Sequence, residues 1–158
     1  MSHASLRETI HNKHFIPAMI KGYKRIFNLI EEKNADILNL VKDKKERCNV
    51  VVFSIDEHEL VELKKREDLY NLEEVKAFHF LTGQEIGKCL VVIDYFLDLD
   101  RKGFSPDKKY FQLCREAAYH VSKEFGKVWD ETTYVSTGEK VVEWLKSNPE
   151  YEKIESIK

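Results

Sequence analysis

The sequence predicts an α+β fold, in which a group of strands is followed by a group of helices. Up to about residue 96, short apolar or alternating runs separated by turn-forming residues are typical of β-strands. Beyond about residue 105, apolar residues recur at helical spacing, and one amphipathic helix interrupts the strands. Strands first and helices later favour the α+β class. With 158 residues, 42% of them apolar, the chain can bury a core as a single domain over residues 1–158.

The first part of the chain is predicted to form a short helix and two pairs of strands. The helix is expected over residues 2–10, and the strands over residues 15–20, 25–30, 35–41 and 48–53. Lys21 and Gly22 are expected to form the turn of the first pair, and a lysine-rich segment the turn of the second. Because proline cannot donate a backbone hydrogen bond, Pro17 suggests that the first strand lies at an edge or at a bulge.

The amphipathic helix that interrupts the strands is predicted over residues 54–67. Two pairs of residues at its start fit a capping box, namely Ser54 with Glu57 and Asp56 with Glu59. In either pair, the first side chain would bond to a free N–H group of the first helical turn, and the glutamate would bond back to the residue before the helix. The sequence leaves open which pair forms the cap.

Glu67 occupies a position on this helix where the apolar pattern calls for a leucine. It follows Leu60 by seven residues and Leu63 by four, which places all three on one helix face, and Tyr70 comes shortly after. A carboxylate against apolar neighbours loses hydration, which raises its pKa and suits a glutamate to acid/base work near neutral pH. Alternatively, Glu67 ends the helix and turns to water or pairs with a basic residue. The pattern alone leaves both interpretations open.

After this helix, two strands and two further helices are expected. The strands are predicted over residues 75–81 and 88–96 around a turn at 82–87, and the last helix over residues 138–146. Ser105 and Pro106 fit a helix cap followed by proline at the first helical position. The helix that they would start has a predicted buried stripe made of Tyr110, Leu113, Cys114, Ala117, Val121 and Phe125. The apolar side of the last helix consists of Val141, Val142 and Leu145.

Composition and charge argue against several classes of function. The formal charge of −2 is spread over many residues of both signs without a basic block, which gives little support for nucleic-acid binding. No apolar run is long enough to span a bilayer and no signal-peptide pattern opens the chain, so no membrane partner is expected. Cys48, Cys89 and Cys114 form no C-x-x-C pair and fit a reducing compartment. We therefore expect a cytoplasmic protein.

Familiar metal-binding and catalytic motifs are absent from the sequence. His11 and His14 are three residues apart, but no carboxylate or cysteine spacing completes a metal-ligand set around them. There is no G-x-S-x-G, P-loop or dinucleotide-binding glycine pattern. Cys114 lies on the predicted buried stripe, where burial raises the pKa of a thiol and makes it inert. We expect neither a metal nor a cofactor.

Several segments, taken together and in order, resemble one known family. Residues 22–28 (GYKRIFN) are similar to a G-Y-x-R-x-F strand, and residues 49–53 (NVVVF) to an N-G-V-x-F strand with valine for glycine. Residues 63–70 (LKKREDLY) are similar to an L-D-x-x-E segment followed by tyrosine. The remaining segments are Ser105-Pro106 through Tyr110, and Phe125-Gly126 with residues 132–134. Their order and spacing over nearly the whole chain resemble the γ-glutamylcyclotransferase family, including its AIG2-like and ChaC-like relatives.

The resemblance implies a mixed β-barrel with flanking helices and a substrate pocket in the barrel. It implies that Glu67 is the catalytic acid/base and that Tyr70 and Tyr110 line the substrate pocket. Such enzymes release 5-oxoproline from γ-glutamyl compounds when the substrate's own α-amine attacks its γ-carbonyl. The implied partner is therefore a small γ-glutamyl molecule, without a metal or cofactor. The leaving amine and the oligomeric state are left open by the sequence.

One element of the family has no counterpart in the sequence. The family opens with a strand ending in Tyr-Gly-Ser, whose backbone N–H groups hold the substrate and stabilise the developing oxyanion. Residues 1–6 resemble the segment just after that loop, so the first strand is apparently missing. We expect that Met1 is an internal methionine of a longer chain and was taken as its first residue. The alternatives are a non-catalytic ligand-binding or interaction module that keeps the fold, and a purely structural domain in which Glu67 pairs with a base.

Overall fold

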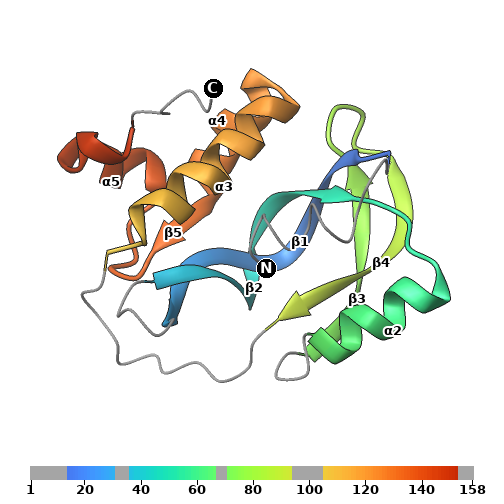
Figure 1. The fold of residues 1–158 in the computed structure, drawn as a ribbon. Coiled ribbons are helices and arrows are strands. Elements are labelled where there is room, and N and C mark those ends of the chain that lie inside the picture. Colours follow the sequence, from blue (N-terminus) through green and yellow to red (C-terminus); the bar gives the residue numbers. More distant parts are fainter. Residues whose placement is uncertain (1–13, 31–35, 67–70, 94–104, 153–158) are drawn as a thin grey trace.

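A computed structural model describes residues 14–30, 36–66, 71–93 and 105–152 of the chain (Figure 1). The strands are β1 (Ile16–Ile30), β2 (Asp36–Val52), β3 (Asn71–His79), β4 (Glu85–Ile93) and β5 (Thr133–Val135). The helices are α2 (Glu57–Arg66), α3 (Lys108–Val121), α4 (Lys123–Thr132), α5 (Val141–Ser147) and the 3-10 turn η1 (Pro149–Tyr151). The α+β class is therefore confirmed. The helix predicted over residues 2–10 and the end of the strand predicted to Phe96 lie outside the described residues.

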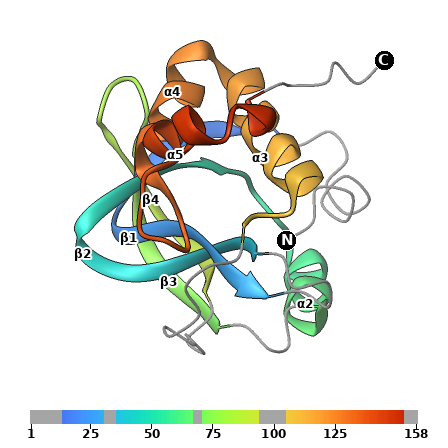
Figure 2. The ribbon, with the colours of Figure 1, turned by 90° about the vertical axis from the view of Figure 1, so that its left-hand side faces the viewer.

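The five strands form one mixed sheet that is organised around β1. The strand order is β2-β1-β3-β4, and β5 pairs with β1 in parallel. β1 pairs with β2 along nearly its whole length, with β3 over Ala18–Ile20 and with β5 over Arg25–Phe27. Figures 1 and 2 place α3, α4 and α5 together at one end of this curved sheet and α2 at the other end. No helix among the described residues is long and apolar enough to cross a membrane.

The prediction of a turn at Lys21 and Gly22 is wrong, because β1 runs through this point as one strand. Gly22 has a φ of 84°, which glycine adopts without steric cost, and here that conformation produces a bulge rather than a reversal. Lys21 pairs with Arg47 and Tyr23 pairs with Lys42, so residues 43–46 of β2 lie opposite Gly22 alone. The lysine-rich segment is accordingly part of β2 and not the predicted turn.

Pro17 lies in a strand with neighbours on both sides, so the prediction of an edge or a bulge is wrong as well. It pairs regularly with Val51 of β2, and its carbonyl accepts a hydrogen bond of 2.9 Å from the N–H of Phe80. The nitrogen of Pro17 points to the same side of β1 as this carbonyl. On that side it lies past the end of β3, which stops at His79. The missing N–H of proline therefore removes no bond from the β1–β3 ladder.

The helix α2 and the hairpin that comes after it agree with the sequence in type and differ in their bounds. Asp56 and Glu59 exchange two hydrogen bonds of 2.8 Å, so this pair forms the capping box. The predicted strand pair after α2 is confirmed as the β3–β4 hairpin, with a shorter turn over residues 80–84. Gly83 at a φ of 69° allows this tighter turn, so β4 begins at Glu85 and not at residue 88.

The C-terminal helices are capped differently from the prediction. Asp107, not Ser105, caps α3, since its carboxylate accepts a hydrogen bond of 2.8 Å from the N–H of Tyr110. Ser122 then ends α3 and caps α4 through the N–H of Phe125, at 3.0 Å. Because this break shifts the helical phase, the continuous stripe predicted from Tyr110 to Phe125 is wrong. The buried residues of α3 are Phe111, Arg115 and Ala118, and Val121 is 37% exposed.

Two hydrophobic clusters meet along β1. One lies beneath the C-terminal helices and consists of Phe27, Phe111, Ala118, Phe125, Trp129, Val135, Val141, Trp144 and Leu145. The other lies between the strands and consists of Ala18, Ile20, Tyr23, Cys48, Val75, Ala77 and Ile93. Val141 and Leu145 of α5 are buried as predicted, and Trp144 joins them. The first half of β1 thus contributes side chains to the cluster between the strands, and its second half contributes to the cluster beneath the helices.

A buried arginine, Arg25, joins the sheet to the helical layer. Its Nε donates to Thr133 Oγ1 at 2.8 Å and its Nη2 to Asn49 Oδ1 at 2.7 Å, while Nη1 donates to the carbonyl of Asn49. Asn49 Nδ2 in turn donates to the carbonyl of Phe125 at 2.8 Å, and the guanidinium lies 5.1 Å from the ring centroid of Trp129. Burial lowers the pKa of Arg25 to about 10, so the side chain remains charged at neutral pH. One guanidinium therefore ties together β1, β2, β5 and α4.

We expect Arg25→Met to lower the free energy of unfolding by about 3 kcal/mol, because several buried oxygens lose their donor. Urea titration followed by circular dichroism measures this change. Lys109→Met, at an exposed position of α3, is the control and should shift stability by less than about 0.5 kcal/mol. Equal effects of the two substitutions would show that the network of Arg25 contributes nothing specific.

Candidate functional site

The residues predicted to form the active site are only partly within the described structure. Glu67 and Tyr70 lie outside the described residues, between the end of α2 at Arg66 and the start of β3 at Asn71. Tyr110 is described and lies in the first turn of α3. The structure therefore places one of the three predicted site residues directly and leaves the other two as predictions.

Tyr110 is half-buried, with its ring against the helical cluster. The ring meets Phe27 of β1 edge to face, at 6.3 Å between centroids and 85° between planes. Burial raises the pKa of the Cys114 thiol, one helical turn further on, to about 11, and a hydrogen bond with Tyr110 partly opposes that rise. The ring of Tyr110 is thus held by packing, while its hydroxyl lies next to a thiol that stays protonated at neutral pH.

Asp36 is a buried carboxylate near the start of α3 that the sequence did not indicate. It is 1% exposed, its N–H donates to the carbonyl of Ser105, and its own carbonyl accepts from the N–H of Asp107. Burial raises the pKa of its carboxyl group, and a hydrogen bond with Ser136 opposes the rise. Among the described residues, its Oδ2 has no hydrogen-bond partner. Since Asp107 caps the N–H of Tyr110, Asp36 positions the turn that carries the predicted substrate tyrosine.

Glu73 of β3 is the first carboxylate after Glu67 whose contacts the structure describes. It accepts a hydrogen bond of 2.8 Å from the hydroxyl of Tyr23 and lies 2.6 Å from the ammonium group of Lys42. The hydrogen bond with Lys42 holds the pKa of Glu73 below its usual range, and the hydroxyl of Tyr23 adds to this effect. A carboxylate stabilised in its charged form is a poor proton acceptor at neutral pH, so Glu73 has a structural part.

The described residues offer little to a metal ion or a thiol nucleophile. Among residues 14–30, 36–66, 71–93 and 105–152, no group of three or more histidine, cysteine or acidic side chains could hold a metal ion. Burial raises the pKa of Cys48 and of Cys89, as it does for Cys114. These thiols stay protonated at neutral pH, and a thiol is a much weaker nucleophile than a thiolate.

Comparison of the whole structure with solved structures shows a common fold. A structure described as γ-glutamyl cyclotransferase superposes with a TM-score of 0.62 at 15% identity, covering 93% of this chain and 90% of that chain. An uncharacterised protein from Homo sapiens superposes with a TM-score of 0.63 at 16% identity, covering 96% and 92%. An Arabidopsis thaliana protein does so with a TM-score of 0.52 at 15% identity, covering 75% and 78%.

The chain has the γ-glutamyl cyclotransferase fold. No protein-family model matches the sequence, and no curated protein sequence does so either. The resemblance carried by the short segments is thus confirmed at the level of the fold, through the course of the backbone and not through sequence identity. At 15% identity, this likeness establishes the γ-glutamyl cyclotransferase fold and leaves the activity to be tested.

Within this fold, sequence reasoning pointed to Tyr110 and missed Asp36. Tyr110 was indicated by the resemblance of residues 105–110 to a proline-tyrosine element of the γ-glutamylcyclotransferase family, whereas its place on a helix face alone is equally typical of core packing. Asp36 stands at the beginning of a strand, where an acidic residue is normally exposed, and nothing in its neighbours signals burial. Its burial arises because the segment from Ser105 to Asp107 packs beside it, and those residues are about seventy positions away in the chain.

We expect Asp36→Asn to change the pH dependence of stability. The raised pKa means that the folded state of the wild type holds a proton that the unfolded state releases near 3.8. Wild-type stability therefore falls as pH rises from this value through the raised pKa, whereas an asparagine cannot ionise. Over that pH range, the free energy of unfolding of the variant should rise relative to that of the wild type. Urea titration at several pH values measures this difference.

Glu57→Gln, which removes an exposed carboxylate at the start of α2, serves as the control for this measurement. A pH-dependent gain of the same size in Glu57→Gln would show that Asp36 is not the source. A constant difference between Asp36→Asn and the wild type at all pH values would contradict the raised pKa itself.

Proposed function

We propose that this chain is a γ-glutamylcyclotransferase-like enzyme that releases 5-oxoproline from γ-glutamyl peptides or amines. The observation that carries the proposal is the fold shared with a solved γ-glutamyl cyclotransferase over 93% of the chain. The second support is the sequence segment at residues 63–70, which contains a glutamate followed by a tyrosine and spans the end of α2 and the residues before β3. Fold likeness by itself does not specify chemistry, so the proposal depends on the side chains of this segment.

In the proposed reaction, the carboxylate of Glu67 removes a proton from the α-ammonium group of the substrate. The freed amine attacks the γ-carbonyl carbon of the same molecule and closes a five-membered ring. The bond from that carbon to the leaving nitrogen then breaks, and the protonated Glu67 delivers its proton to the departing amine. The ring nitrogen loses a second proton as the lactam forms, and the regenerated Glu67 carboxylate accepts it and passes it to the released amine, which leaves as an ammonium group. Both protons lost by the α-ammonium group are thus transferred through one carboxyl group, and no redox change occurs. Because both reacting groups belong to one substrate molecule, the protein mainly orients the chain for attack.

The two tyrosines would orient the substrate in this scheme. Tyr110 is suited to this role because its ring is fixed edge to face on Phe27, and part of its surface remains accessible. A fixed phenol can offer a hydrogen bond to the substrate with little loss of conformational freedom. Tyr70 is proposed for the same pocket from its position three residues after Glu67.

Two carboxylates whose placement is described, Glu73 shortly after this segment and Asp36 beside the start of α3, are poor substitutes for Glu67. Glu73 is engaged by Lys42 and Tyr23, and its pKa is lowered. Asp36 has a raised pKa but is 1% exposed, and a base that no substrate can reach does not act on it. Glu67 can therefore be tested by substitution without either of these acids taking over its role.

We expect Glu67→Gln to reduce 5-oxoproline release by about a hundredfold or more, since general acid/base catalysis contributes factors of this size. The measurement is the amount of 5-oxoproline formed from γ-glutamyl dipeptides and γ-glutamylamines under saturating substrate. Glu62→Gln, an exposed glutamate on α2 that pairs with Lys65, is the matched control and should retain full activity.

Equal turnover by wild type and Glu67→Gln would overturn the mechanism. A wild type that binds a γ-glutamyl ligand in calorimetry without forming 5-oxoproline would overturn the enzymatic proposal in favour of a binding module. Both outcomes are informative because the two assays use the same protein and the same ligands.

We expect Tyr110→Phe to raise KM by about three- to tenfold, the range for one lost neutral hydrogen bond, with a smaller effect on stability. Phenylalanine keeps the ring contact with Phe27 and removes only the hydroxyl. Tyr151→Phe is the matched control, because its hydroxyl bonds the carbonyl of Pro106 near the same helix start, at 3.1 Å. If Tyr151→Phe changes KM as much as Tyr110→Phe does, the effect comes from the helix position and not from substrate contact.

A further inference from the structure

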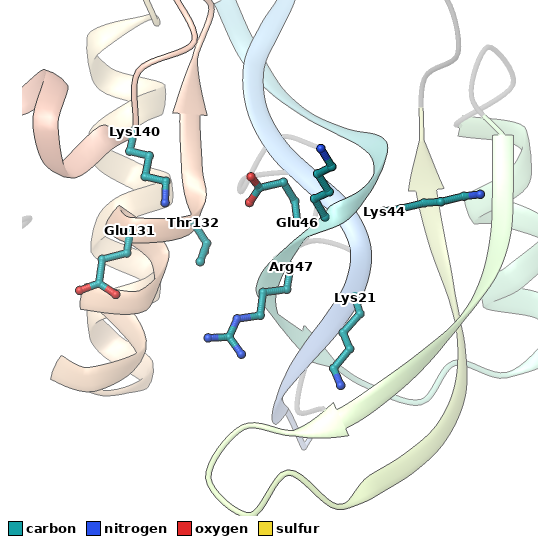
Figure 3. A pocket seen from close by; sticks show the side chains of 8 residues that line it. Lys21, Lys44, Glu46, Arg47, Glu131, Thr132 and Lys140 are labelled. Carbon is teal, nitrogen blue, oxygen red and sulfur yellow. The ribbon is translucent and has the colours of Figure 1, made fainter.

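A cavity that Tyr110 does not line lies between the bulge of β2 and the C-terminal elements. Its volume is about 360 Å³, and it is lined by Lys21, Lys44, Lys45, Glu46, Arg47, Glu131, Thr132 and Lys140. Figure 3 shows that Lys21, Lys44, Glu46 and Arg47 come from β1 and β2, while Glu131, Thr132 and Lys140 come from the elements around α4 and β5. Four separate stretches of the chain thus contribute to one hollow.

The bulge opposite Gly22 brings the basic residues of β2 to this hollow. Residues 43–46 have no partners on β1, so they bow outwards from the ladder. The pairs on either side of the bulge are Lys21 with Arg47 and Tyr23 with Lys42. Lys21 and Arg47 are like charges directly opposite each other on neighbouring strands, an arrangement that destabilises a sheet. Because Lys21 and Arg47 both line the cavity, their positive charges are available to an anion bound there.

The cavity carries an excess of positive charge. Five of its lining side chains are cationic and two are anionic, so three positive charges are left over. Within the part of the chain that the structure describes, no carboxylate forms an ion pair with Lys44, Lys45 or Arg47. Other exposed lysines do have such partners, for example Lys76 with Glu85 and Lys88 with Glu74. The charges of Lys44, Lys45 and Arg47 are therefore not neutralised by an ion pair with any described carboxylate.

The carboxylate of Glu46 is held by a tyrosine. The hydroxyl of Tyr134 donates to Glu46 Oε1 at 2.8 Å, and burial together with this bond raises the pKa of Tyr134 to about 12, so the donor stays protonated. Lys24 lies 4.0 Å from the ring centroid of Tyr134, and Lys140 lies 5.8 Å from it. Tyr134 thereby positions the ammonium group of Lys140 at the edge of the cavity and occupies one oxygen of Glu46.

We propose that this cavity binds a compact anion that carries at least two phosphate groups. The guanidinium of Arg47 can bind a phosphate with two parallel hydrogen bonds, and the lysines act as point donors around it. A volume of about 360 Å³ lies at the small end of ligand sites and accommodates a short phosphate chain. Among the described residues, no aromatic side chain lines the cavity, so a nucleobase has no ring there to stack on.

Tyr110, the one proposed catalytic-site residue that the structure describes, does not line this cavity. Figure 3 shows the side chain of Lys44 extending away from the other labelled groups, so we assign the main contacts to Arg47 and Lys140. These two residues come from opposite walls of the cavity, one from β2 and one from the segment before α5. A ligand that touches both must lie inside the hollow and not on one strand.

Isothermal titration calorimetry of the purified chain with inorganic tripolyphosphate tests the proposal. We expect saturable binding that the double substitution Arg47→Gln with Lys140→Gln weakens by about tenfold or more, because charge-assisted hydrogen bonds are lost on both walls. The matched control is Lys64→Gln with Lys109→Gln, which removes two exposed charges from α2 and α3. This control should weaken binding by less than about twofold, as expected for distant screened charges.

An equal loss in the two double variants would overturn the site, because binding would then follow overall charge alone. Citrate binding as tight as that of tripolyphosphate would overturn the preference for phosphate. Single-stranded oligonucleotides that bind more tightly than tripolyphosphate, with affinity rising with length, would replace the small anion by a nucleic acid. If the double variant loses its fold by circular dichroism, Lys45→Gln alone is used, with Lys109→Gln as its control.

Discussion

The buried guanidinium of Arg25 is the interaction on which the arrangement of the layers depends. Its donors reach β2 through Asn49, β5 through Thr133 and the end of α4 through Thr132, and its acceptors are neutral. Only arginine offers several N–H groups in one plane, so neither lysine nor an apolar residue can make this set of bonds. The sheet and the helical layer are therefore held in one relative position by polar contacts in addition to apolar burial.

This polar connection also decides where the predicted active site can lie. Arg25 precedes Phe27 by two residues, so both point to the same face of β1, and Phe27 is the residue on which Tyr110 rests. Asp36 and Asp107 then set the first turn of α3. The position of Tyr110 thus results from a chain of contacts that begins in the sheet. The proposed polyanion site uses the same strands on the other side of the bulge, with Lys21 and Arg47 in place of apolar residues.

Local patterns were enough to predict the class of fold, the capped helix α2, the β3–β4 hairpin and the buried side of α5. Capping and alternation act over a few residues, so the sequence shows them directly. The long strands β1 and β2 could not be predicted in this way. Gly22 and the lysines of residues 42–47 favour a turn locally, and only their pairing with each other makes them strand. Tyr110 could be singled out only through the family resemblance of its segment, whereas the burial of Asp36 depends on residues far along the chain.

The bulge at Gly22 has a consequence for how sequences of this fold can vary. Along β1, residues before the bulge and residues after it place their side chains by a period of two, and the extra residue adjusts the phase between them. Ile20 and Tyr23 are three residues apart, so in an unbroken strand Tyr23, Arg25 and Phe27 would point to the face opposite Ala18 and Ile20. The bulge therefore brings side chains of odd spacing to the buried face, and a substitution at Gly22 that straightened β1 would expose the second set although Gly22 itself has no side chain to lose.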